Sequence, residues 1–183
     1  MVWFVKPLAF LKRDFLNASS YKASYILQFL GIFFSTTTFF FLSKMFKPNP
    51  VLEFKSYGGE YFPFVLIGLA FSDYLITALQ TFSGIVREGQ LTGTLEPLLL
   101  TQTGLPAIIF SSSVYPFILT SLRVLVYLAL GAGLFGVRFA TGGLMGALIL
   151  LILTVISFSS VGIISASFVM VFKKGDPFGW AFG

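Results

Sequence analysis

Long uncharged stretches alternate with short polar segments along the chain and predict its helices. A helix needs about 20 mostly apolar residues to cross the hydrocarbon core of a membrane, and four stretches are long enough. The predicted spans are residues 23–43, 61–86, 106–137 and 143–172. The last two are longer than a straight crossing of the hydrocarbon core requires, so we expect each to include an interfacial portion or a kink. The candidate positions are Pro106, Pro116 and Gly142–Gly143.

The first 22 residues have a different pattern. Apolar side chains recur at helical spacing, at Phe4, Leu8, Leu11 and Phe15, with charged residues among them. This spacing predicts an amphipathic helix over residues 1–22 that lies in the membrane interface. A secretory signal peptide is disfavoured, because no charged segment leads into an apolar core that ends at a small-residue cleavage site.

Composition places the chain in the membrane class. Apolar residues make up 56% of its 183 residues and charged residues only 10%, whereas roughly 25% is usual in soluble domains. Ionic side chains are too few to cover a soluble globule, which disfavours a soluble enzyme. The chain has no cysteine and no histidine, so thiolate nucleophiles and the commonest general base and metal ligand are missing. We therefore predict an all-α polytopic membrane protein with no metal site.

Lysine and arginine set the expected orientation. The net charge of +5 comes from 12 basic and 7 acidic residues. In a membrane protein this excess reflects loop topology and anionic lipid headgroups rather than nucleic acid. A cytoplasmic N-terminus places seven of the basic residues inside and four outside, which favours that orientation. Four spans then place residues 173–183 in the cytoplasm as well.

Two charges interrupt the spans. Asp73 lies in the second span and Arg123 in the third, and because these spans are antiparallel the two charges fall at broadly similar depth. A lone charge at mid-bilayer costs about 2.5–3.5 kcal/mol, which pairing would partly offset. We expect an intramembrane ion pair that locks the two helices. The alternatives are a role in lining a translocation path or in a conformational switch, and independent snorkelling to the interface.

Small residues recur four apart in the last span, as Gly142 with Gly146 and Gly162 with Ala166. This spacing allows helices to approach closely in lipid. The alternative is that apolar helices simply contain many glycines and alanines.

The segment 87–104, between the second and third spans, carries the most specific signals. Its sequence is REGQLTGTLEPLLLTQTG. Gly93 precedes Thr94, a suitable N-cap, and Glu96 and Pro97 then fall in the first helical turn, where both residue types are favoured. An apolar side is supplied by Leu95, Leu98, Leu99 and Leu100. We predict a short helix at the inner face, which is either a turn back into the membrane or a docking helix for a cytosolic partner.

The pattern R-E-x-Q-L-x-G-T-L-E-x-L-L-x-T in this segment resembles the loop of the type-2 permease subunits of ABC transporters. The resemblance covers nearly the whole chain and includes Tyr61–Phe64, Gly68–Ala70, Leu122–Arg123, Leu134–Val137 and Lys173–Pro177. Members of this family usually have six spans. Because the chain stops after its fourth, we expect it to be a fragment of a six-span protein.

The resemblance implies the membrane half of an exporter, in the plasma membrane of a bacterium or archaeon. It implies a homo- or heterodimer of permeases that binds two cytosolic ABC ATPase subunits. Those partners would bind the ATP, since the chain has no G-x-x-x-x-G-K-[S/T] phosphate loop, and we expect no cofactor of its own. It further implies an ATPase-coupling loop. Its candidate residues are Arg87, Glu88, Gly93, Thr94 and Glu96.

The candidate residues of the coupling loop differ in their expected roles, and several of them also have a simpler structural interpretation. Thr94 and Glu96 lie in the segment presented to the ATPase, and Glu88 and Arg87 flank it as possible ion-pair partners. Glu96 can instead merely favour the positive end of its helix, and Gly93 can serve only the turn. Lysines 173 and 174 are explained as positive-inside anchors. The N-terminal helix either only lies on the membrane or also contacts the ATPase.

Other functions fit the sequence less well. An intramembrane enzyme needs paired carboxylates, a serine with a histidine base, or a metal cluster, and the spans hold one Asp and one Arg. A passive channel or a membrane assembly or scaffold protein is the alternative to active transport. Its one supporting feature is the hydroxyl run Ser35–Thr38, whose side chains can also bond back to their own helix. The substrate stays open among drugs, lipids, polysaccharides and peptides.

Overall fold

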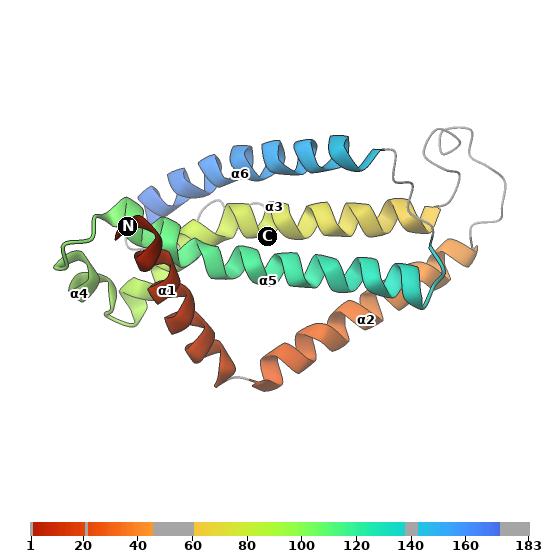
Figure 1. The fold of residues 1–183 in the computed structure, drawn as a ribbon, viewed down its shortest axis with the longest axis horizontal. Coiled ribbons are helices and arrows are strands. Elements are labelled where there is room, and N and C mark those ends of the chain that lie inside the picture. The colour runs from red at the N-terminus through yellow and green to blue at the C-terminus, as the bar shows by residue number, and fades with distance from the viewer. Residues whose placement is uncertain (1, 21, 46–60, 138–142, 173–183) are drawn as a thin grey trace. The chain divides into compact units, whose positions relative to one another are not determined.

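Six helices and no strand make up the residues described by the structure, a computed structural model that covers 2–20, 22–45, 61–137 and 143–172 (Figure 1). In chain order they are α1 (Val2–Ser19), α2 (Lys22–Met45), α3 (Tyr61–Leu91), α4 (Leu95–Leu99), α5 (Leu105–Gly133) and α6 (Leu144–Phe172). The predicted all-α fold is confirmed. Helices α2, α3, α5 and α6 are long and apolar enough to cross a membrane, as the uncharged stretches predicted.

The helix ends differ from the predicted spans by more than two residues in two places. Helix α3 continues to Leu91, five residues into the predicted loop, and α5 stops at Gly133 rather than at residue 137. Beyond α5, Gly136 has a φ of 67°, a left-handed conformation that suits glycine and turns the chain out of a helix. Hydropathy marks where a helix enters lipid, whereas backbone conformation decides where the helix ends.

The two prolines expected to kink α5 lie at different positions in that helix. Pro106 is the second residue of α5, where a missing N–H costs nothing. Pro116 lies in the interior of the same helix, where it removes one backbone hydrogen bond. Gly142, and with it the proposed spacing to Gly146, lies outside the described residues, as does the segment 173–183.

The chain divides into two compact units. Unit 1 comprises Met1–Ser20, Tyr74–Thr120 and Ile152–Gly183, and unit 2 comprises Tyr21–Asp73 and Ser121–Leu151. Helices α1 and α4 belong to unit 1 and α2 to unit 2, while α3, α5 and α6 each contribute residues to both.

In unit 1, α6 lies close against α3 at Gly162. A Cβ atom added to Gly162 would lie 2.5 Å from the carbonyl oxygen of Ala78 and 2.9 Å from that of Leu79, so only glycine permits this approach. Ala166, one turn further along α6, is also buried. The close approach that the spacing of Gly162 and Ala166 allows is therefore present in the structure. Gly146 is exposed, with no described neighbour within 4 Å.

A hydroxyl contact joins α3 to α5 in the same unit. The Oγ1 atoms of Thr77 and Thr120 lie 2.7 Å apart, and Thr120 is fully buried. Such hydrogen bonds between helices replace the contact with water that lipid cannot offer.

In unit 2, three phenylalanine rings form an aromatic cluster. Phe40, near the end of α2, lies 5.3 Å from Phe62 at the start of α3 and 4.5 Å from Phe135, just after α5, between ring centroids. The rings of Phe62 and Phe135 are 5.5 Å apart. The Nζ of Lys44 lies 5.2 Å from the Phe40 centroid, in cation–π range. This aromatic cluster brings three helix ends together.

Candidate functional site

The turn between α3 and α4 has the conformation that its glycine allows. Gly93 has a φ of 67°, which costs a residue with a side chain about 1–2 kcal/mol. The N–H of Thr92 donates to the carbonyl of Glu88 over 2.9 Å, and that of Gly93 donates to the carbonyl of Gln90 over 3.4 Å. These bonds close the last turn of α3. The predicted turn at Gly93 is thus confirmed.

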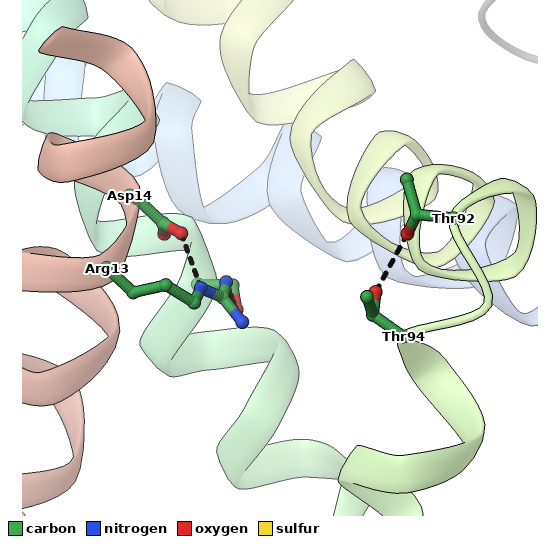
Figure 2. Close-up of polar contacts among 5 residues, drawn as sticks. Arg13, Asp14, Thr92 and Thr94 are labelled. Atoms are coloured by element: carbon green, nitrogen blue, oxygen red, sulfur yellow. Dashed lines mark hydrogen bonds and ion pairs between the residues drawn. The ribbon is translucent and has the colours of Figure 1, made fainter. Parts of the chain in front are cut away.

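Thr94 occupies the predicted N-cap position of α4 but does not cap it in the expected way. Its backbone is already helical, with φ −87° and ψ −16°, and its side chain makes no capping hydrogen bond. The Thr92 hydroxyl donates to the carbonyl of Glu88 over 2.8 Å. Because a hydroxyl has one proton, Thr94 must be the donor in the 2.8 Å contact between the two threonines (Figure 2).

Leu95 fixes α4 to the rest of unit 1. Its side chain is 8% exposed and belongs to a core cluster with Phe82 and Val86 of α3 and Ala166 and Val169 of α6. We call these five residues the α4 anchor. A short helix of this kind gains its order from packing rather than from its own hydrogen bonds.

Gly89 makes room for that packing. It is buried in the last part of α3, and a Cβ atom on it would lie 3.2 Å from the Cβ of Leu95. The sequence pattern grouped Leu95 with Leu98, Leu99 and Leu100 as one apolar side. The structure separates them, because Leu99 is 44% and Leu100 88% exposed. Packing against α3 and α6 distinguishes these leucines, and sequence spacing over six residues does not carry that signal.

The charged candidates lie on the outside of this segment. Arg87 and Glu88 are exposed on the last turns of α3, and Glu96 is exposed in the first turn of α4. Among the described residues, the ion pair within 4 Å is that of Arg13 with Asp14, so these three side chains are not paired with each other. Unit 1 therefore presents an anchored short helix whose outer side carries charge of both signs together with exposed leucines.

Arg13 connects α1 to α5 within unit 1. Its Nε donates to Oδ1 of Asp14 over 2.8 Å (Figure 2), and its Nη2 donates to the Oγ of the buried Ser112 over 3.4 Å. Its guanidinium carbon lies 4.8 Å from the ring centroid of Phe10. On the predicted apolar face of α1, Leu8 and Phe15 are more than half exposed. An interfacial helix has this property, since its apolar side chains reach into lipid.

The structure places Asp73 and Arg123 together in unit 2. The two charges attract each other electrostatically, and Tyr127, one turn after Arg123, lies within the field of both. No N–O contact within 4 Å joins Asp73 to Arg123 in the described part of the chain. The Nε of Arg123 is buried without a hydrogen-bond partner. The predicted direct ion pair is therefore not formed between these two side chains, although both lie in unit 2.

Two hydroxyls of the run Ser35–Thr38 in α2 donate to backbone carbonyls of the same helix. Thr36 donates to the carbonyl of Ile32 and Thr38 to that of Phe34, each over 2.8 Å. The Oγ1 of Thr37 is buried without a partner. Two of the three threonines therefore have no free proton to offer a pore.

No family model, no curated protein and no solved structure matches this chain. The class of protein can be stated from the length and composition of its helices. With four helices long and apolar enough to cross a membrane, it is an α-helical multi-pass membrane protein.

Proposed function

We propose that the chain is the membrane-spanning subunit of an ABC exporter and receives its energy from a separate cytosolic ATPase through α4. In this proposal it sits in the plasma membrane of a bacterium or archaeon and pairs with a second permease, identical or related. Both termini face the cytoplasm. The ATPase partner binds and hydrolyses ATP, and the chain moves substrate.

One observation carries the proposal: α4 is packed against the rest of unit 1 on one side and exposed on the other. Leu95 packs into the α4 anchor between α3 and α6, while Glu96 is exposed on the same short helix. A push on the open side is passed to two long helices at once, because close-packed side chains move together rather than deform. This is the mechanical requirement for coupling a partner's motion to a membrane bundle.

The residues around α4 support a protein partner rather than a plain return into the membrane. Leu91 is 78% and Leu100 88% exposed, next to the exposed charges of Arg87, Glu88 and Glu96. Apolar residues surrounded by polar ones are typical of protein-binding surfaces. The resemblance of segment 87–104 to the permease loop supports an ABC ATPase as that partner.

The test is co-purification of the full-length chain with its ATPase from the native membrane. We expect the wild type to retain the ATPase and Glu96→Lys to reduce its recovery about tenfold, because reversing a contact charge costs at least about 1.4 kcal/mol. Gln102→Lys, at an exposed position after α4, is the control and should retain the partner. Full recovery with Glu96→Lys would remove α4 from the contact.

A further inference from the structure

Arg123 is the described charged group whose position is least explained by the fold. It lies within unit 2 on α5 and is partly buried, and its Nε is enclosed without a hydrogen-bond partner. A buried donor on a charged group that lacks a partner is strongly unfavourable. Proteins therefore rarely keep such a group unless a second arrangement or a bound ligand satisfies it.

The aromatic cluster fixes the depth of this group. Phe62 and Phe135 are in contact. Asp73 follows Phe62 by 11 residues and Arg123 precedes Phe135 by 12, which at 1.5 Å per residue places each about 16–18 Å from the cluster along its helix. With the aromatic cluster at the outer end of the predicted spans 61–86 and 106–137, this distance is about half the thickness of the hydrocarbon core, which places Arg123 far from the headgroups of surrounding lipids.

Asp73 does not neutralise Arg123 by direct contact. No N–O contact within 4 Å joins the two in the described part of the chain, and the Nε–H of the guanidinium is left without an acceptor. A guanidinium in this state matches a carboxylate, phosphate or sulfate group, which accepts two of its N–H bonds at once.

We infer that Arg123 binds the negatively charged group of an amphiphilic substrate in the middle of the membrane, with Asp73 as the resting counter-charge that the substrate displaces. The inference rests on the proposed transport function and names its substrate class. A small hydrated anion is disfavoured, because it would have to lose its whole hydration shell to reach this depth. An amphiphile brings an apolar body that suits the exposed Leu122 and Leu125 on the same helix.

The test is thermal unfolding of the full chain in dodecyl maltoside micelles with increasing dodecyl phosphate as the probe. A ligand that binds only the folded state raises the unfolding midpoint. We expect the wild type and the charge-matched control Lys22→Gln to show the same increase. Arg123→Gln should need at least about tenfold more dodecyl phosphate for half of the increase. Inorganic phosphate should leave the midpoint of all variants unchanged.

Two further variants keep the test decisive if Arg123→Gln folds poorly. Asp73→Asn should respond at lower dodecyl phosphate than the wild type, because the competing carboxylate is gone. Arg123→Lys should respond more weakly than the wild type, because it keeps the charge but not the forked donor geometry. An equal response of wild type and Arg123→Gln, or no gain in Asp73→Asn, overturns the inference, and an equal response to inorganic phosphate overturns the substrate class. ATPase co-purification does not depend on these results and tests the transport role separately.

Discussion

At the scale of single residues, the most informative side chain is Leu95. It is the member of a leucine-rich segment that is buried, and it touches two long helices through the α4 anchor. Its neighbour in sequence, Glu96, is exposed. One residue therefore attaches α4 to the bundle while the next is available to a partner.

Truncating Leu95 should loosen α4 without unfolding the membrane helices. Leu95→Ala removes a buried side chain, so we expect the local opening free energy of residues 92–101 to fall by about 2–3 kcal/mol. Amide hydrogen exchange in detergent measures this. Leu100→Ala, at an 88% exposed position, should change it by no more than about 0.5 kcal/mol. Equal exchange in the two variants would mean that Leu95 does not hold α4.

At the scale of helices, the contact between α3 and α6 depends on a position without a side chain. The backbone of α3 at Ala78 and Leu79 approaches Gly162 so closely that a methyl group has no space. In lipid, association of helices relies on this kind of packing because the hydrophobic effect no longer favours it. The α4 anchor uses the next turns of the same two helices, so the glycine contact also positions the site.

Gly162→Ala should separate α3 from α6. The added Cβ would lie 2.5 Å from a backbone oxygen, and backbone must move to relieve the contact. We expect a loss of about 1–3 kcal/mol in the free energy of unfolding, measured in detergent by thermal or denaturant unfolding. Gly146→Ala, on the same helix with open space around it, is the control and should be neutral or slightly stabilising. A neutral Gly162→Ala would contradict the close approach.

Helix identity was predictable from the sequence, and helix ends and contacts were less so. Uncharged stretches located α2, α3, α5 and α6 because a long apolar helix leaves a strong linear signal. The end of α5 depends on the backbone conformation at Gly136, which hydropathy does not report. The same applies to the candidate site. Gly93 and Thr94 were placed correctly, but the hydroxyl of Thr94 bonds to Thr92 instead of capping α4.

The charge pair shows a further limit of sequence reasoning. Counting residues from the helix ends gave Asp73 and Arg123 similar depth, and the structure places both in unit 2. Whether two side chains at one depth touch depends on how their helices are rotated about their own axes. That rotation is set by packing over the whole helix, so the pattern around either residue does not report it.

At the scale of the whole molecule, the proposed function requires α4 to face the cytoplasm. The chain contains no natural cysteine, so single introduced cysteines report topology cleanly. We expect Gln102→Cys to react with a membrane-impermeant maleimide only in inverted vesicles, and Leu134→Cys, at the other end of α5, only in intact cells. The reverse pattern would contradict the orientation expected from the basic residues and the coupling role of α4.

The brevity of α4 has a practical consequence. Five residues form little more than one helical turn, too few to be stable in water on their own. A synthetic peptide copied from segment 87–104 would lack the neighbours that give Leu95 its pocket, and it would spend most of its time as a random coil. Such a peptide would be a poor decoy for the proposed ATPase partner, and an inhibitor aimed at the proposed contact would need a scaffold that imposes the helical turn in advance.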